Sequence, residues 1–270
     1  MRVSDDHSDP PPPAPASEPG SEHGELRARW RALRERLGVP CDPVPAEERR
    51  ALGPRFGFEP GDDADALLAA GWPRRPVERF GRRFFPRLDE GTPGGALPLQ
   101  DPSAPDAIVR APDGSIRVRQ AGEGLRAEAL LPDLAAFVDA FHALLEEARF
   151  GPDAAPAPTD DAPWLHPDAE AALRARLPGD ADALLLRFGL TTLADHRHYL
   201  HGERKSATIL ALAGALFLAL TLLLLVAPFG RFAGRAAVTV VVGCVPLTLL
   251  AFGLRARAEA AARLAALPPS

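Results

Sequence analysis

The sequence predicts a small α+β soluble domain followed by a helical stalk and an antiparallel two-helix transmembrane hairpin. Apolar residues between 25 and 150 follow both the helical period and the two-residue period of strands, which is typical of mixed secondary structure. Two long uncharged runs, 206–230 and 236–254, are typical of membrane spans. A segment rich in proline, alanine and aspartate, 151–168, separates the two kinds of sequence.

The composition narrows the class of protein before any motif is considered. A chain of 270 residues has room for one ordinary domain with appendages. Its 46% apolar content and net charge of −5 give no reason to predict a nucleic-acid partner. Cys41 lies in the soluble part and Cys244 in an apolar run, so no disulfide, thiolate metal site or cofactor is predicted. One lysine, Lys205, among many arginines is typical of a GC-rich bacterial genome.

Residues 1–24 are predicted to form a disordered tail. The segment combines acidic residues with a run of prolines, and it has too little apolar surface to offset the entropy of ordering. It lacks the basic start and the apolar stretch of a signal peptide. The next segment, 25–37, has the pattern of an amphipathic helix whose apolar face is made by Leu26, Trp30, Leu33 and Leu37.

The soluble domain is predicted over 25–150. Short helices follow Pro45 and end at Gly71, and a β-hairpin turns at 112–114. A longer helix starts at Pro132, and its apolar face at helical spacing is made by Leu134, Phe137, Val138, Phe141, Leu144, Leu145 and Ala148. These elements supply a core of ordinary size, so we expect the domain to fold without the anchor.

The order of these segments resembles that of a known family. N-terminal helices are followed by "GGALPL", a hairpin through "APDGS" and a closing helix in "LLPDLAAFVDAFHALL". Over about residues 25–150 this order resembles the SUKH superfamily of Smi/Knr-like domains. The resemblance implies a small mixed sheet partly wrapped by helices, a phenylalanine placed like Phe137, and the binding of a toxin by an immunity protein. The chain departs from the family near Pro45, where "PAEERRAL" replaces a proline followed by an aspartate–tyrosine pair.

After the linker at 151–168, residues 169–205 are predicted to form a helical stalk next to the membrane. Two helical segments are separated by a break at Pro178 and Gly179. One apolar stripe of the stalk is made by Leu186, Leu190, Leu193 and Leu200. We expect this stripe to pack on the stalk itself, on the soluble domain or on the bilayer surface.

The membrane spans are predicted at 206–228 and 236–254, followed by a cytoplasmic tail at 255–270. The connection is too short to cross back, so the spans form an antiparallel hairpin. Six basic residues flank the outer ends of the spans and two lie in the turn, which favours cytoplasmic termini. The four nearest the spans are Arg204, Lys205, Arg255 and Arg257. We therefore expect a two-pass protein of the cytoplasmic membrane, in contact with lipid.

Small residues at every fourth position predict how the first span packs. They are Ala207, Ala211, Ala215 and Ala219. Small side chains at this spacing let helix backbones approach closely in lipid. The facing surface is either the second span, around Thr239 and Gly243, or another copy of the chain, and the oligomeric state stays open.

The stretch "HRHYLHGERK", 196–205, admits two interpretations. At successive three-residue spacings stand the metal-site candidates Asp195, His198 and His201. Tyr199 and the basic pair at 204–205 instead fit the polar shoulder of a span, with a belt aromatic and a positive flank. Because the stretch contains no metal motif such as HExxH, we predict the shoulder and no metal site.

The chain contains no local motif for catalysis: GxGxxG, Walker, GxSxG and HExxH sequences are all missing. No catalytic residue is therefore predicted. We expect a membrane-tethered cytoplasmic module that binds another protein, and the SUKH resemblance implies a toxin as that partner. One alternative is a small membrane-assembly or envelope protein whose hairpin is the functional element. An enzyme without a local signature is the third interpretation.

Overall fold

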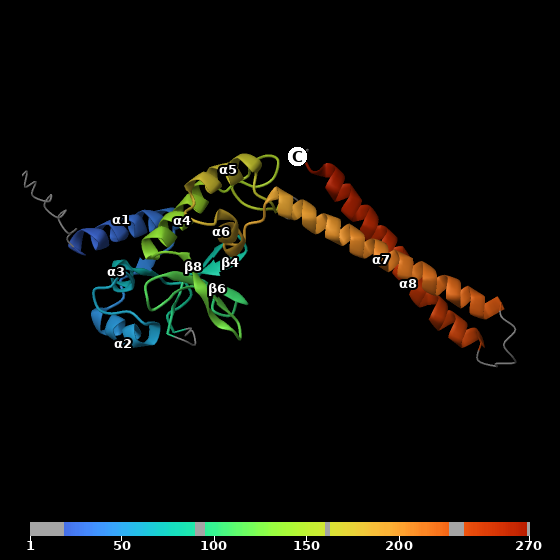
Figure 1. The fold of residues 1–270 in the computed structure, drawn as a ribbon, viewed down its shortest axis with the longest axis horizontal. Helices are drawn as coiled ribbons and strands as arrows, with labels where there is room; N and C mark the ends of the chain where they lie inside the picture. The colour runs from blue at the N-terminus through green and yellow to red at the C-terminus, as the bar shows by residue number, and fades with distance from the viewer. Residues whose placement is uncertain (1–18, 90–94, 160–162, 227–234, 269–270) are drawn as a thin grey trace, which may run out of the picture. The chain divides into compact units, whose positions relative to one another are not determined.

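The computed structural model describes residues 19–89, 95–159, 163–226 and 235–268. The chain forms two compact units, and each is described by itself (Figure 1). The α+β unit comprises Met1–Glu146 and Arg176–Phe188. The hairpin unit comprises Glu147–Ala175 and Gly189–Ser270.

Five helices belong to the α+β unit: α1 (Pro19–Leu37), α2 (Ala46–Phe56), α3 (Asp63–Ala70), α4 (Leu134–Glu147) and α6 (Ala181–Arg187). The predicted apolar face of α1 is confirmed, because its four residues are all buried. The long helix is confirmed as α4, with its predicted face buried except for the half-buried Leu145. Asp133 caps α4, since Asp133 Oδ1 accepts a hydrogen bond of 2.7 Å from the Ala136 amide.

The strands of this unit form small antiparallel sheets, so the α+β class of the soluble part is confirmed. Two are two-stranded, pairing β1 (Cys41–Asp42) with β2 (Trp72–Pro73) and β3 (Val77–Arg79) with β4 (Arg82–Phe84). The third has the order β5 (Leu97–Pro98), β6 (Asp106–Arg110), β7 (Ile116–Gln120) and β8 (Gly124–Leu131). Its predicted β6–β7 hairpin turns where Gly114 has a φ of 86°, a conformation that glycine adopts without strain.

An aromatic cluster forms the core of the α+β unit. Phe137 and Phe141 of α4 pack on Phe84 and Phe85, which end the β3–β4 hairpin. Phe188, directly after α6, stacks on Phe84, Phe137 and Phe141 with ring centroids 5.5–5.7 Å apart. One ring of the core, Phe188, is therefore supplied by a segment that lies far along the chain from the rest of the cluster.

Two predicted boundaries differ from the structure at this point. Of the tail predicted to be disordered at 1–24, residues 19–24 are helical because α1 begins at Pro19, and residues 1–18 lie outside the described part. Proline suits a first helical turn, where no amide donor is needed. The predicted stalk at 169–205 is divided: Arg176–Phe188, which contains α6, belongs to the α+β unit, and the rest belongs to the hairpin unit.

The hairpin unit begins with the predicted linker, whose far end is packed rather than free. Trp164 and Leu165 are buried, and the Leu165 amide donates to the Thr191 carbonyl at 2.8 Å. Helix α5 (Pro167–Arg176) follows. Apolar side chains at the end of the linker therefore hold it in place, although its composition is typical of an extended spacer.

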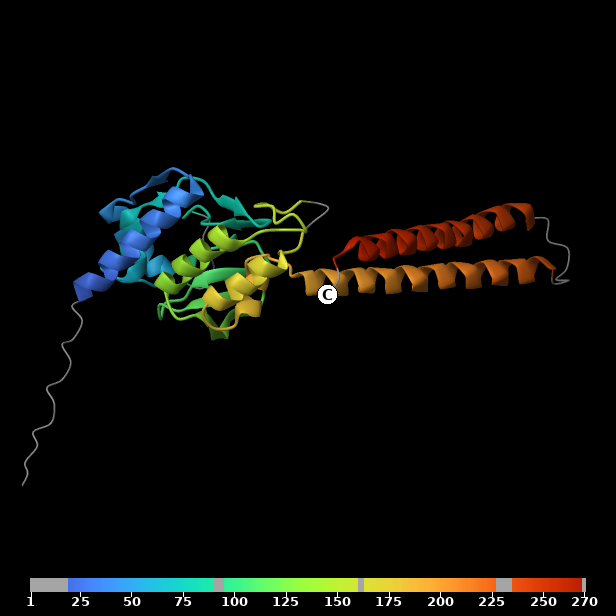
Figure 2. The ribbon, with the colours of Figure 1, turned by 90° about the horizontal axis from the view of Figure 1, so that it is seen from above.

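Two long helices, α7 (Leu193–Val226) and α8 (Arg235–Ala266), complete the hairpin unit. They run antiparallel and side by side, as both ribbon views show (Figure 2). Helix α8 continues twelve residues beyond 254, so most of the tail predicted at 255–270 is helical. Of the predicted leucine stripe, Leu190, Leu193 and Leu200 are buried, but Leu186 is exposed and does not share a helix face with them, because the chain is not helical between α6 and α7.

Candidate functional site

The interface between α7 and α8 repeats every seven residues. On α7 the buried positions include Leu200, Ala207, Gly214 and Thr221. On α8 they include Pro246, Gly253 and Ala260. A seven-residue repeat keeps one side chain in every second turn facing the partner when two helices wind gently around each other. The two helices therefore form a continuous seam of mostly small residues.

Two glycines bring the helix backbones into contact. A Cβ atom added at Gly214 would lie 2.6 Å from the Leu250 nitrogen, and one added at Gly253 would lie 2.6 Å from the Ala211 nitrogen. No real Cβ atom approaches a backbone that closely, so any larger residue forces the helices apart. Close backbone approach is the means by which helices associate in lipid, where no hydrophobic effect drives them together.

The predicted alanine stripe is half right. Ala207 and Ala211 are buried in the seam, but Ala215 and Ala219 are exposed. Each four-residue step overshoots a full turn by about 40°, so a strict fourfold repeat drifts off the interface. The surroundings of Gly243 lie outside the described part of the chain. The seven-residue spacing of small residues within each helix, Ala207 to Gly214 on α7 and Gly253 to Ala260 on α8, is the sequence signal that identifies the seam.

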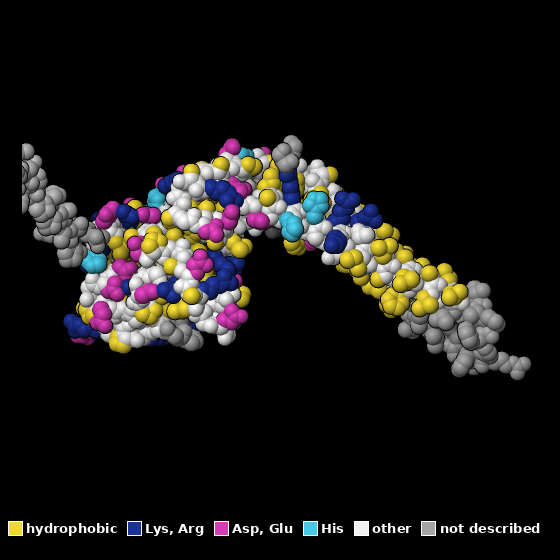
Figure 3. All heavy atoms as spheres, viewed as in Figure 1, with side chains coloured by type: hydrophobic (Ala, Val, Ile, Leu, Met, Phe, Trp, Pro, Cys, Tyr) yellow, Lys and Arg dark blue, Asp and Glu magenta, His cyan; other side chains and the backbone are white. Residues whose placement is uncertain are grey.

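The outer surface of the hairpin is strongly apolar (Figure 3). Its exposed large side chains are Ile209, Leu212, Leu216, Phe217, Leu220, Leu222, Leu223, Val245, Leu247, Phe252 and Leu254. In the described part of the chain one helix, Leu193–Leu223, is long and apolar enough to cross a membrane by length and composition. Only 22% of its most apolar window is buried, whereas a core helix of a soluble protein is mostly buried.

Basic side chains border this apolar surface at one end. Arg204, Lys205, Arg255 and Arg257 are all exposed, and we call them the basic collar. Arg255 Nε donates to Glu259 Oε1 at 2.8 Å. Arg204 and Lys205 lie on α7 and Arg257 on α8, each within one or two helical turns of the apolar side chains. The four predicted topology residues therefore lie at the same end of the hairpin.

The histidine stretch forms the first turns of α7. Thr192 and Asp195 cap the helix reciprocally: Thr192 Oγ1 donates to Asp195 Oδ2 at 2.8 Å, and the Asp195 amide donates to Thr192 Oγ1 at 3.0 Å. His196 stacks between Trp164 and Tyr199. Burial, together with the charge of Arg263, holds the pKa of His196 below its ordinary value. The cap and the stack account for the start of this stretch without a ligand.

The metal-site candidates Asp195, His198 and His201 are not brought together with further ligands. Among the described residues, no group of three histidine, cysteine, aspartate or glutamate side chains is arranged to hold a metal ion. Asp195 is engaged in the helix cap, while His198 and His201 are exposed.

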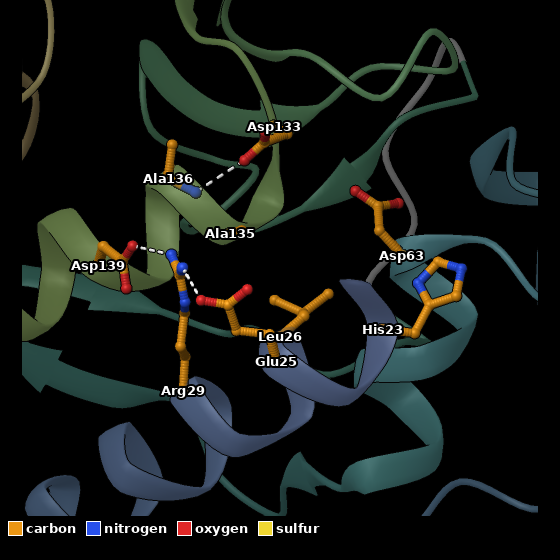
Figure 4. A pocket seen from close by; sticks show the side chains of 9 residues that line it. All are labelled: His23, Glu25, Leu26, Arg29, Asp63, Asp133, Ala135, Ala136 and Asp139. Atoms are coloured by element: carbon orange, nitrogen blue, oxygen red, sulfur yellow. Dashed lines mark hydrogen bonds and ion pairs between the residues drawn. The ribbon is translucent and has the colours of Figure 1, made fainter. Parts of the chain in front are cut away.

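A second candidate site is a hollow of about 440 Å³ in the α+β unit (Figure 4). Four carboxylates line it, together with one guanidinium and one imidazole. In the close view, Arg29 of α1 reaches between Glu25 and Asp139 and forms ion pairs with both. The other polar lining residues are Asp133, Asp63 and His23. The hollow is therefore acidic, with α1, α3 and α4 each supplying part of its wall.

Beneath the hollow, Asp63 belongs to a buried ion cluster that sequence patterns did not reveal. Arg110 of β6 is 1% exposed and donates to Asp62 Oδ2 at 2.7 Å and to Asp63 Oδ1 at 2.8 Å. Burial and the neighbouring Asp62 raise the pKa of Asp63 above its ordinary value. Burial acts on Asp62 in the same direction, but hydrogen bonds from Asp63 and the charge of Arg110 outweigh it and lower the pKa of Asp62.

The chain matches no protein-family model, no curated protein and no solved structure.

Proposed function

We propose that the chain is a two-pass membrane protein whose α7–α8 hairpin anchors a protein-binding α+β unit at the cytoplasmic face. The observation that carries the proposal is the exposed apolar band of the hairpin, which surrounds a seam of small residues and ends at the basic collar. Leaving such side chains in water forgoes about 2 kcal/mol for each one that could be buried. Lipid covers this band at no such cost.

The basic collar supports an orientation with both termini in the cytoplasm. Its four residues lie within two turns of the apolar band, where basic residues influence topology most strongly. We expect a reporter fused after Ser270 to be active only as a cytoplasmic fusion, and the membrane fraction to resist extraction by alkaline carbonate. Changing the four collar residues to glutamine should produce a mixture of orientations.

A matched control keeps the number of removed charges constant. Arg27, Arg31, Arg75 and Arg126 are exposed arginines of the α+β unit, and changing all four to glutamine should leave the orientation intact. Release of the wild-type protein by carbonate would overturn the membrane anchor. A reporter active on the external side would overturn only the orientation.

For the α+β unit we propose that the acidic hollow contacts a protein partner with a basic surface. The excess of carboxylates over cations in the hollow supports a positively charged partner. The resemblance to the SUKH superfamily supports a toxin as the class of partner, which the unit would neutralise by binding. This role needs no catalytic residue.

Site-specific photocrosslinking in cells tests this surface. A photoreactive residue at Ala135, which lines the hollow, should give a discrete adduct with one protein. The same residue at Ala127, on the exposed strand β8, is the matched control and should give none. Adducts of equal yield at both positions would contradict a specific role for the hollow.

A further inference from the structure

Beside the small-residue seam, α7 and α8 leave an open groove of about 600 Å³ at the collar end of the hairpin. Leu210 and Phe252 line its apolar end. Glu203 and Glu259, one from each helix, line its polar end. The groove therefore changes from hydrocarbon-like to acidic along its length.

The two carboxylates lie at matching depth. Glu203 precedes Leu210 by seven residues, and Glu259 follows Phe252 by seven, so each lies about 10 Å along its helix from the apolar end. A headgroup layer extends about 5–8 Å beyond the hydrocarbon core on each side of a bilayer. With the apolar end in hydrocarbon, both carboxylates therefore reach the level of the lipid headgroups.

Each carboxylate has one oxygen engaged and one available. Glu203 Oε1 accepts a 2.7 Å hydrogen bond from the Tyr199 hydroxyl, and Glu259 Oε1 accepts the 2.8 Å bond from Arg255. Within the described residues, Oε2 of either side chain has no hydrogen-bond donor. The hydrogen bond from Arg255, and then its charge, hold the pKa of Glu259 below its ordinary value, so this group is ionised at neutral pH.

The order of chemical groups along the groove matches one class of lipid. From the apolar end outward come Leu210 and Phe252, then the Ser206 hydroxyl, and then the two carboxylates. A phospholipid with a primary ammonium presents acyl chain, phosphate and ammonium in the same order. Arg263 also lines the groove, about one turn beyond Glu259 on α8.

We propose that this groove binds a phospholipid whose headgroup carries a primary ammonium, such as ethanolamine. The free oxygens of Glu203 and Glu259 accept N–H bonds from the ammonium, the Ser206 hydroxyl donates to the phosphate, and Leu210 and Phe252 contact an acyl chain. A choline headgroup has the charge but no N–H donor, and an anionic headgroup meets two carboxylates. The inference rests on the proposed insertion of the hairpin into a membrane.

Lipid retention by the full-length protein tests the assignment. The chain is inserted into nanodiscs containing equal amounts of ethanolamine, choline and glycerol phospholipids with identical acyl chains, and retained lipid is counted by native mass spectrometry. We expect about tenfold preference for the ethanolamine lipid over the choline lipid, the ratio that one or two charge-assisted hydrogen bonds provide. Adding methyl groups to the ammonium one at a time should lower retention stepwise.

The variant with Glu203→Gln and Glu259→Gln should bring the ethanolamine-to-choline ratio close to one. Glu128→Gln, which removes an exposed carboxylate of β8, is the matched control and should keep the wild-type ratio. Equal retention of the three lipids by the wild-type protein would overturn the inference. A preference for the glycerol lipid that survives the double substitution would overturn it as well, because the collar alone would explain that result.

Insertion is scored separately in nanodiscs made only of choline lipid. A wild-type chain that fails to insert there contradicts the membrane anchor itself. A chain that inserts but shows no headgroup preference contradicts only the lipid site. Circular dichroism of each variant establishes that the two substitutions leave the helices intact.

Discussion

Arg110 is the residue whose surroundings depend most on the tertiary fold. It lies on a central strand and is fully buried, yet its guanidinium is matched by Asp62 and Asp63 at the start of α3 and by the Gly57 and Ala111 carbonyls. Burying a charge is costly unless it is paired and hydrogen-bonded. The cluster therefore links β6 to α3 in one specific arrangement.

Removal of this guanidinium should destabilise the α+β unit. Arg110→Met leaves two adjacent carboxylates without their cation, and we expect a loss of about 3 kcal/mol in the free energy of unfolding. Urea unfolding of the full-length protein in detergent, followed by tryptophan fluorescence, measures it. Arg126→Met changes an exposed arginine of β8 and should cost less than about 0.5 kcal/mol. Equal effects of the two substitutions would contradict the role of the cluster.

Asp101 gives the fold a defined sensitivity to acid. Burial raises its pKa, but hydrogen bonds from the amide and hydroxyl of Ser103 and the charge of Arg83 outweigh burial, so the pKa is lowered overall. A lowered pKa in the folded state contributes stability above the ordinary carboxyl pKa of about 3.9, and this contribution is lost as pH falls through the folded value. Asp101→Asn should therefore destabilise the protein at pH 7 and destabilise it less at about pH 3. Urea midpoints at both pH values check this, and a loss equal at both would contradict it.

At the scale of elements, the hairpin is held by backbone contact rather than by large side chains. The seam glycines stand opposite backbone atoms of the partner helix, whereas the large apolar side chains point outward. A soluble helix pair has the reverse arrangement, with its large side chains between the helices. This inversion supports the proposal that the hairpin lies in lipid.

Enlarging a seam glycine should separate the helices. Gly214→Leu and Gly253→Leu each place a side chain against backbone atoms, and we expect a loss of at least about 1–3 kcal/mol from overpacking. Ala215→Leu and Ala219→Leu are matched controls on the exposed face of α7, and should leave stability nearly unchanged. Thermal melting in nanodiscs distinguishes the two pairs. Equal melting temperatures for all four variants would show that the seam does not hold the hairpin.

At the scale of the whole molecule, the chain leaves the α+β unit after α4 and returns to it for Arg176–Phe188. The returning segment inserts Phe188 into the aromatic core and pairs Arg187 with Asp106 of β6. The segment 25–150, predicted from the sequence as the complete domain, therefore lacks part of its core.

Two fragments test the contribution of the returning segment. Residues 19–188 should unfold cooperatively, and residues 19–150 should be less stable by about 3–5 kcal/mol, the usual cost of deleting a buried phenylalanine. Phe188→Ala within the longer fragment should account for most of this loss. Leu186→Ala, at a side chain that is 61% exposed, is the control and should have little effect. Equal melting temperatures for the two fragments would contradict a structural role for the segment.

Much of the local structure follows from the sequence alone. Helical spacing identified the buried faces of α1 and α4, and the Pro112–Gly114 turn identified the β6–β7 hairpin, because these features depend on contacts close in sequence. The length and apolar composition of α7 likewise follow from the sequence, since crossing a bilayer depends on both. The number of spans and the position of the termini stay predictions.

The tertiary structure decided what depends on distant residues. It brought Arg110 to Asp62 and Asp63, placed Phe188 in the core, and aligned Glu203 with Glu259 across the hairpin groove. It also showed that the seam follows Gly214 and Gly253 rather than a fourfold alanine repeat. The period of one helix restricts which residues share a face, but only a second helix or strand determines which face is covered.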